Sequence, residues 1–585
     1  MPSPRRALFH PLLDHLRPGR HWLPLLNWLP GYHRHLFLAD FGASLIVAAL
    51  LIPQAIAYAL LAGLPPQTGL YASTLPLLAY ALFGSAMTQS VGPTALTSMM
   101  TASALAPIAA RGEDPIAAAL LLALLSGAML IACGLLRLGR ITQLLSHPVV
   151  SGFTSGTAIL IALGQLGPLL QLPLSGNLVP ALLGGLWRAL PQVSAAALSF
   201  GLLALAAFAL GSELLPGLLR RLGVPPRHAG WAGRLAPLPI LAALAVYATY
   251  APGNPTLVGP LPTAALVLEW PSFTPDEVAT LWLPALLLGL VGFLQSITIS
   301  QSLALARGET VSPDQELIAL GAANIAAGVA GALPVSGGFA RTAVNANAGA
   351  RTPLSGVLAA GWVLLVAAWL SPLLQALPRA ALAATIILAS LKLIDLRLLL
   401  ATWRYDKRDA AALLATLLVT LCFGALPGIG SGVLLSLALF IHRVSQPQVV
   451  VVGRLPGTEH FRNIERFPVQ TWPGLLLLRV DESLYFGNAQ AVQLRVAELL
   501  ARHPDTRDAV LILSGVASID FSAAEALAQL DHGLAKRGVT LYLAELKVPL
   551  RQALVGSGLL DPLLERTFLS AQHAVLGLAG WRGER

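Results

Sequence analysis

Long apolar runs separated by short polar breaks follow one another from about residue 41 to about residue 442. An α-helix needs roughly 20 apolar residues to cross a bilayer, and no charged residue occurs between Asp40 and Arg111. The pattern therefore predicts a polytopic α-helical membrane protein with fourteen membrane segments. The segments of the first half are approximately 41–60, 69–84, 93–109, 116–136, 149–168, 195–214 and 236–251. Those of the second half are approximately 280–304, 315–332, 339–350, 355–374, 379–395, 408–425 and 427–442.

Seven segments in each half, an odd number, would make the two halves (about 41–251 and 280–442) inverted repeats of each other in the membrane. The basic loops after segments four, six and twelve all fall on one side, and the acidic loop with Asp276 and Glu277 falls on the other. Basic loops favour the cytoplasmic side. We therefore expect a multi-pass protein of the cell membrane, inner or plasma, with both termini in the cytoplasm.

The character of the chain changes at both ends of this region. Residues 1–40 are basic and rich in proline, which predicts a cytoplasmic N-terminal segment before a membrane domain at 41–444. Residues 445–473 mix glycine, proline and charge and are predicted to form a linker. From 474 to 585, strand-like runs such as Leu475–Val480 alternate with helical stretches, which predicts a small cytoplasmic α/β domain.

The composition excludes several functional classes. The chain is 56% hydrophobic and 11% charged, with a mean hydropathy of +0.71, whereas soluble domains carry about 25% charged residues. The net charge of +9 resides largely in short loops, where it sets topology, so nucleic acid is not predicted as a partner. Cys133 and Cys422 lie in apolar runs, which argues against a disulfide or a metal site. Walker A, HExxH, CxxC and GxSxG motifs are missing, so neither an enzyme nor a cofactor is predicted.

The strongest candidate chemistry lies in PVSGGFARTAVNANAGA, residues 334–350. Gly337 and Gly338 interrupt any helix, and a new helix of small residues is predicted to begin at Phe339. A helix that starts inside the membrane directs unpaired N–H groups and a positive dipole end into a cavity. Arg341 adds a full charge, which at the bilayer centre costs roughly 2.5–3.5 kcal/mol and marks a candidate functional site.

A second stretch, SVGPTALTS at Ser90–Ser98, has the same construction. Gly92 and Pro93 break the chain, and a helix of small and hydroxyl residues follows. Paired interrupted segments in the two halves of a transporter indicate a binding site near the bilayer midplane. Two helix starts and one arginine together favour an anion.

Several long motifs resemble the sulfate permease family, also called solute carrier family 26. They are LIPQAIAYALLAGLPPQTGLYAS (Leu51–Ser73), SVGPTA, HPVVSGFTSG, QELIALGAANIAAGVAGALPVSGGFARTAVN and GRLPGTEHFRNIERFP. In addition, LSGVASIDFSAAEALAQL resembles the core of a STAS domain, which this family carries at its C-terminus. The resemblance extends over essentially the whole chain after residue 36.

The resemblance implies a core and a gate subdomain built from two inverted seven-segment repeats, elevator-like alternating access and a homodimer. It places a small inorganic anion between the starts of the third and tenth helices. The matching residues are Gln54 on the first helix, Thr94 and Ala95 at the third helix start, and Phe339, Ala340 and Arg341 at the tenth. Each has a structural alternative: a carbonyl partner for Arg341, an interhelical hydrogen bond for Gln54, and ordinary capping for Thr94.

Two positions depart from the family pattern. Gln295 stands where many H⁺- or Na⁺-coupled members have an acid, and an amide takes up no proton. Exchange, facilitated flux, or coupling to H⁺ or Na⁺ elsewhere therefore stay open, with Tyr58 and Ser296 as further residues expected to line the site or couple transport. In the STAS domain, Phe521 occupies the position of a phosphorylated serine in small regulatory relatives, and Ser522 is predicted to cap the helix.

The function expected from these features is secondary active transport of an inorganic anion, with sulfate foremost. A bicarbonate or dicarboxylate transporter or exchanger is the first alternative, and an uncoupled anion channel is another. An alternative of a different class is a membrane scaffold whose STAS domain binds cytosolic proteins.

Overall fold

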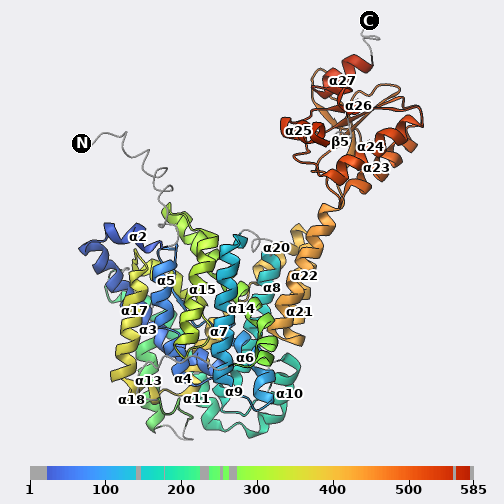
Figure 1. Cartoon of the computed structure of the whole chain (residues 1–585). Coiled ribbons are helices and arrows are strands. Elements are labelled where there is room, and N and C mark those ends of the chain that lie inside the picture. Colours follow the sequence, from blue (N-terminus) through green and yellow to red (C-terminus); the bar gives the residue numbers. More distant parts are fainter. Residues whose placement is uncertain are drawn as a thin grey trace. The chain divides into compact units, whose positions relative to one another are not determined.

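The computed structural model describes residues 23–139, 146–174, 176, 178–223, 225, 236–250, 255–261, 273–557 and 561–579. The chain forms two compact units, Met1–Ser436 and Leu437–Arg585 (Figure 1). The described part of the first unit consists of helices and one two-stranded ribbon, and the second unit contains a six-stranded sheet with helices.

The helices of the first unit follow the apolar runs of the sequence. The first half contains α2 (Leu25–Trp28), α3 (Arg34–Leu61), α4 (Pro66–Tyr71), α5 (Leu75–Phe83), α6 (Ala95–Ala110), α7 (Pro115–Leu135), α8 (His147–Gly164), α9 (Leu166–Leu170), α10 (Val179–Ala189), α11 (Ala195–Arg221) and α13 (Pro237–Tyr250). The second half contains α14 (Pro275–Arg307), α15 (Pro313–Val329), α16 (Phe339–Ala348), α17 (Leu354–Trp369), α18 (Ser371–Gln375), α19 (Arg379–Leu391), α20 (Leu396–Tyr405), α21 (Lys407–Phe423) and α22 (Ala425–Val444), the last of which continues into the second unit.

Each predicted membrane segment coincides with a helix or with two consecutive helices. The predicted segments 69–84, 149–168 and 355–374 are each divided in two. By length and composition, the helices able to cross a membrane among the described residues are Arg34–Leu61, Pro115–Leu135, His147–Leu170, Pro275–Arg307 and Ala425–Val444. Several shorter apolar helices accompany them. The number of fourteen crossings stays a prediction.

Apart from the four-residue α2, two helices in the described part of this unit, α10 and α20, lie where no segment was expected. Both are short, and α20 carries Arg397 and Arg404 among its leucines. A criterion based on long apolar runs does not detect such helices, because their apolar residues cover only one face.

Glycines allow a close and extensive contact between α7 and α15. A Cβ atom on Gly127 would lie 2.6 Å from the carbonyl oxygen of Gly321, and one on Gly321 would lie 2.7 Å from that of Gly127. Small residues of this kind let membrane helices approach backbone to backbone. The pair α7 and α15, blue and green in Figure 1, thus joins the two halves of the chain.

The second unit is a sheet with strand order β4-β3-β5-β6-β7-β8. The strands are β3 (Val449–Arg454), β4 (Phe461–Asn463), β5 (Leu475–Val480), β6 (Asp508–Ile512), β7 (Thr540–Ala544) and β8 (Thr567–Phe568). The last four are parallel, whereas β3 runs antiparallel to both β4 and β5. The helices are α23 (Ala489–Arg502), α24 (Phe521–Ala535), α25 (Val548–Ser557), α26 (Asp561–Leu564) and α27 (Ala571–Leu578). Alternate strand residues form two cores, one with α23 and α24 and one with α27.

The prediction of a linker at 445–473 is wrong over much of its length. The run of valines from Val449 to Val452 forms most of β3 and pairs with β5, so that Val450 lies opposite Arg479. β-Branched residues favour a strand, and here that preference outweighs the glycine, proline and charge around it.

The prediction that Ser522 caps α24 is also wrong. The cap is Asp520, whose carboxylate accepts hydrogen bonds from the N–H of Ala523 and from the N–H of Phe486, both at 2.8 Å. Asp520 has the extended backbone typical of an N-cap, and Ser522 lies within the first turn.

Candidate functional site

A short β-ribbon brings the two predicted helix starts together. Strand β1 (Val91–Gly92) pairs antiparallel with β2 (Ser336–Gly337), with Val91 opposite Gly337 and Gly92 opposite Ser336. The N–H of Gly338 extends the ribbon by donating to the carbonyl of Ser90 at 3.1 Å. Because α6 and α16 begin just after these strands, their N-termini lie next to each other although nearly 250 residues separate them in sequence.

Ser296 on α14 and Thr342 on α16 hold the ribbon in place. The hydroxyl of Ser296 accepts from the N–H of Gly337 at 2.7 Å and donates to the carbonyl of Gly292 at 2.7 Å. The hydroxyl of Thr342 accepts from the N–H of Ser90 at 3.1 Å. Ser296 is fully buried, so in this structure it supports β2 rather than facing open space.

Thr94 caps α6. Its hydroxyl accepts from the N–H of Thr97, and its own N–H donates to the Thr97 hydroxyl at 3.2 Å, which makes a capping box. The same hydroxyl is 3.2 Å from that of Ser336 on β2. Thr94 therefore has the capping role that the sequence left open. Its hydroxyl also links the chain break before α6 to the one before α16, through Ser336.

The Arg341 guanidinium lies between the two breaks. The side chain is 3% exposed, and Nη1 donates to the carbonyl of Pro93 at 2.7 Å. A Cβ atom on Gly338 would lie 2.9 Å from Nε, and one on Gly92 would lie 3.2 Å from Nη2. Only the missing side chains of these glycines make room for the guanidinium. Pairing with a backbone carbonyl, the alternative noted from the sequence, thus occurs at one of its three nitrogens.

The other two nitrogens of Arg341, Nε and Nη2, have no hydrogen-bond partner in the part of the chain that the structure describes. Tyr58 on α3 interacts electrostatically with the guanidinium and is itself buried. No carboxylate contacts Arg341 among the described residues. The positive charge is therefore uncompensated at the point where two helix N-termini meet.

The remaining predicted residues differ in how accessible they are. Phe339 is 57% exposed and Ala340 is exposed, whereas Ala95 is buried. Gln54 on α3 and Gln295 on α14 are half-buried, and no hydrogen bond joins either side chain to the described residues. Helix α3 packs against α6 and α16, and α14 packs against both as well. Gln54 and Gln295 thus belong to the two helices that flank the helix starts.

Two charged residues that the sequence did not single out hold the far end of α16. Gly349, with φ of 104°, ends the helix in the left-handed conformation that glycine favours. Arg307 donates to the carbonyls of Ala346 and Ala350 at 3.0 and 3.1 Å. The buried Asp40 carboxylate accepts from the N–H groups of residues 351 and 352 and from Tyr32. In sequence Arg307 looks like an ordinary charge at a helix end, with Glu309 two residues later, so no local signal pointed to it.

A second buried carboxylate fixes the chain ahead of β1. Glu316 on α15 is fully buried and accepts from the Tyr80 hydroxyl at 2.8 Å. It also accepts from the N–H and hydroxyl of Ser85 and from the N–H of Ala86. The hydrogen bonds that this buried carboxylate needs are thus supplied by α5 and by the segment between α5 and β1.

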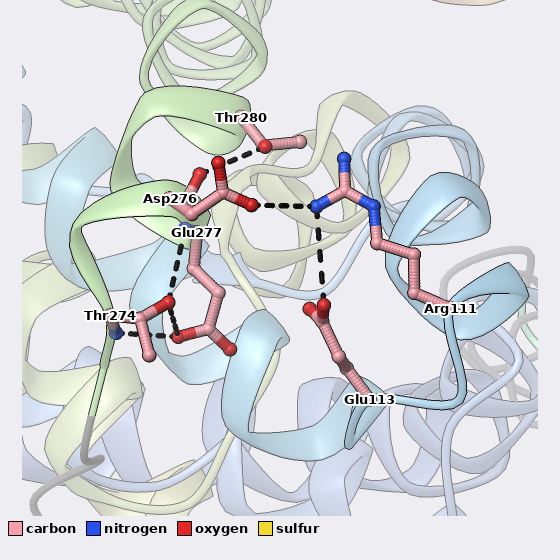
Figure 2. A network of polar contacts seen from close by, with 6 residues as sticks. All are labelled: Arg111, Glu113, Thr274, Asp276, Glu277 and Thr280. Carbon is pink, nitrogen blue, oxygen red and sulfur yellow. Dashed lines mark hydrogen bonds and ion pairs between the residues drawn. The ribbon is translucent and has the colours of Figure 1, made fainter.

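An exposed network joins the opposite end of α6 to the start of α14 (Figure 2). Arg111 donates to Asp276 at 2.9 Å and lies 3.9 Å from Glu113. Thr274 and Glu277 form a capping box at the first turn of α14, in which the N–H of Thr274 donates to the Glu277 carboxylate at 2.6 Å. Asp276 is therefore paired with Arg111 and Glu277 with the cap of its own helix, and neither contacts Arg341.

Comparison with known proteins decides the family. The model of the sulfate permease family matches residues 37–416, and the model of the STAS domain matches residues 466–574. The chain belongs to the sulfate permease family. It is 33% identical over 579 residues to the chloroplastic sulfate transporter 4.1 of Arabidopsis thaliana, covering 96% of this chain and 82% of the relative. It is 35% identical to a probable sulfate transporter of Mycobacterium tuberculosis, covering 94% and 98% of the two chains.

The fold agrees with a solved structure. The murine solute carrier 26 family member A9 anion transporter, in the inward-facing state, superposes with a TM-score of 0.83 over 95% of this chain and 94% of that chain, at 22% identity. The prediction of a helical membrane protein with a C-terminal STAS domain is confirmed, as is the resemblance to the sulfate permease family. The chain is a multi-pass membrane transporter of anions and not an enzyme.

Proposed function

We propose that this sulfate permease family member carries sulfate or a closely similar oxyanion across the membrane. The anion would bind at the starts of α6 and α16 and be exposed to the two sides in turn by an elevator-like movement. The observation that carries this proposal is the β1–β2 ribbon, which holds both helix N-termini and the uncompensated Arg341 at one point.

The electrostatics of that point suit a dianion. Each helix start contributes roughly half a positive charge, and the guanidinium adds a whole one. The acids on the surrounding helices, Asp40 on α3 and Asp276 and Glu277 on α14, are engaged at other places. The Arg341 guanidinium adjoins the backbone of Gly92 and Gly338, and its Nε and Nη2 have no partner among the described residues.

Uptake of labelled sulfate by purified full-length protein in proteoliposomes tests the proposal. Arg341→Gln removes the charge but keeps a donor for the Pro93 carbonyl, and Arg351→Gln, whose side chain is exposed, is the matched control. We expect Arg341→Gln to lower uptake roughly 10- to 100-fold, because a hydrogen bond to a charged group contributes about 1.5–3 kcal/mol. Equal uptake by the two variants would refute the site.

The same assay separates the rival functions. Bicarbonate and dicarboxylates offered as competitors distinguish a transporter of those anions, and conductance of single molecules in a planar bilayer would reveal a channel. No anion movement by the full-length protein would favour the scaffold. We infer that Gln295 couples no ion, so imposed H⁺ and Na⁺ gradients should leave sulfate uptake unchanged unless another residue provides the coupling.

The cellular setting belongs to the same proposal. Basic loops support a cell-membrane protein with both termini in the cytoplasm, surrounded by lipid. The family resemblance supports a homodimer and cytosolic protein partners for the STAS domain. Accessibility of single engineered cysteines to an impermeant reagent in intact cells would test the orientation of the termini.

A further inference from the structure

Helix α20 connects two membrane helices and is too short to cross the membrane itself. It has 10 residues, which extend about 15 Å, whereas the hydrocarbon core of a bilayer is about 30 Å thick. It begins shortly after the end of α19 and is followed directly by α21. Asp406, the residue between α20 and α21, has an extended backbone, so the chain changes direction there. Because α19 and α21 coincide with predicted membrane segments, we expect α20 to lie at the membrane surface.

Helix α20 leaves an apolar strip uncovered. Leu396, Leu400 and Trp403 follow one another at intervals of about one turn on one side of the helix, and they are 65%, 63% and 54% exposed. None of the residues of α20 is buried, although its other side packs against α8 and α21. Contiguous exposed apolar surface of this kind marks a site of contact with lipid or with another protein.

Two arginines border this strip. Arg397 and Arg404 lie about two turns apart and therefore on the same side of the helix, next to the leucines. Both are exposed, and neither has a hydrogen bond or an ion pair with the described residues. The two acids that flank α20 in sequence, Asp395 and Asp406, cap α20 and α21 by accepting backbone N–H groups at 2.9 and 2.8 Å. The positive charge beside the strip is therefore available to an outside partner.

The combination of strip and arginines suits the interface of a bilayer. Leucine and tryptophan side chains enter the boundary of the acyl chains, while arginines at the edge of the same helix reach the phosphate groups. Lipid also surrounds the two membrane helices between which α20 is held. An anionic headgroup adds an attraction that a neutral one lacks, and each arginine near the surface contributes about fivefold in local lipid concentration.

We propose that α20 lies in the membrane interface and binds anionic phospholipids. Leu396, Leu400 and Trp403 enter the boundary of the acyl chains. Arg397 and Arg404 bind the headgroup phosphates. The proposed orientation of the chain places α20 at the cytoplasmic leaflet, which is the more anionic one. Because α20 packs against α8 and α21, the bound lipid holds this part of the membrane unit at the surface.

Fluorescence quenching by brominated lipids tests the proposal with the full-length protein in vesicles. The vesicles consist of phosphatidylcholine with a minor share of phosphatidylglycerol, and bromine is carried on the acyl chains either of the phosphatidylglycerol or of an equal amount of the phosphatidylcholine. The quenching of Trp403 is the difference between the unaltered protein and Trp403→Phe. We expect phosphatidylglycerol to be enriched roughly 5- to 25-fold over phosphatidylcholine around Trp403. Both leaflets contain both lipids, so the result does not depend on orientation.

Two outcomes would contradict the proposal. Equal quenching of Trp403 by the two brominated lipids would overturn the binding of anionic headgroups. No quenching of Trp403 by either lipid would show that protein, such as a second copy of the chain, covers the strip, and would overturn the interfacial position as well. The measurement requires no sulfate transport, so its result is independent of the proposed function.

Paired arginine variants test the assignment to α20. Arg397→Gln combined with Arg404→Gln should abolish the preference for phosphatidylglycerol while Trp403 stays quenched, because the apolar strip is intact. The matched control is Arg220→Gln combined with Arg221→Gln, which removes the same charge from the exposed end of α11 and should leave the preference unchanged. If the control lowered the preference as much as the α20 variant, the lipid would be responding to the total charge of the protein, and the assignment would be wrong.

Discussion

The two helix starts that meet at the β1–β2 ribbon differ in how their first backbone N–H groups are capped. Helix α6 begins with Thr94, whose side chain forms a capping box with that of Thr97 and satisfies the N–H groups of Thr94 and Thr97, while those of Ala95 and Leu96 have no partner among the described residues. Helix α16 begins with Gly338, which has no side chain to cap it, and its first two residues are exposed. The α6 start is therefore partly capped by its own side chains, whereas no side chain caps the α16 start.

The C-terminal ends of α6 and α16 also differ, in the charged groups that they contact. Helix α6 ends at an exposed ion pair of Arg111 with Asp276, and α16 ends at hydrogen bonds from Arg307 to its last carbonyls. A cation at the C-terminus of a helix compensates the negative dipole end and so leaves the positive end more effective. At the proposed site we therefore expect α16 to contribute more of the anion affinity than α6 does.

A built-in anion at the α16 start should abolish transport. In Gly338→Asp the new carboxylate would cap the free N–H groups and lie against the Arg341 guanidinium, because even a Cβ atom there is 2.9 Å from Nε. Sulfate uptake should fall by about 100-fold or more, since a tethered ligand acts at millimolar effective concentration or higher. Gly338→Ala separates crowding from charge and should retain more activity. An aspartate variant as active as the alanine variant would contradict a binding role for this helix start.

The existence of these starts could be predicted from the sequence, because their signals are local. Gly337, Gly338, Gly92 and Pro93 interrupt apolar runs, and Arg341 is conspicuous among uncharged residues. Their pairing could be expected only by analogy with other transporters. Strands of two residues are too short to show an alternating pattern, so the β1–β2 ribbon could not be predicted from the sequence.

The supporting residues could not be predicted for a different reason. Arg307, Asp40 and Glu316 act on groups that only the packing of distant helices brings near, and each looks like an ordinary helix-end charge in sequence. The carbonyl partner of Arg341 lies 248 residues away. The linker prediction failed because glycine, proline and charge were weighed above the short valine run of β3.

Removing the cation at the far end of α16 should have the next largest effect. Arg307→Ala loses two charge-assisted hydrogen bonds to Ala346 and Ala350, and we expect sulfate affinity to fall roughly 3- to 30-fold, with the maximal rate less affected. Arg307→Lys keeps the charge and should recover most of the affinity. The concentration dependence of initial uptake provides the measurement, and equal affinities for the alanine and lysine variants would show that charge at this end is irrelevant.

Removing the cap of α6 should affect stability more than transport. Thr94→Ala costs about 1 kcal/mol, as loss of an N-cap usually does, which thermal unfolding in detergent would register as a lower Tm. Sulfate affinity should change by less than about threefold, because the donors that bind it lie mainly on α16. Thr94→Ser keeps the hydroxyl and should restore the Tm. A larger loss of affinity than of stability would place Thr94 in the site and weaken the contrast between the two starts.

The smallest effect is expected at the outer end of α6. Arg111 and Asp276 are both well exposed, at 45% and 78% of their side chains, and exposed ion pairs contribute only about 0–1 kcal/mol. Arg111→Ala should therefore leave sulfate uptake within about twofold, although it removes an arginine from the end of a site helix just as Arg307→Ala does. High salt should abolish even this small difference, because it screens exposed charges. Arg111→Ala and Arg307→Ala form a matched pair. If both lowered sulfate affinity equally, the anion would be responding to the general positive charge of the helix ends. The expectation that α16 contributes more affinity than α6 would then be wrong.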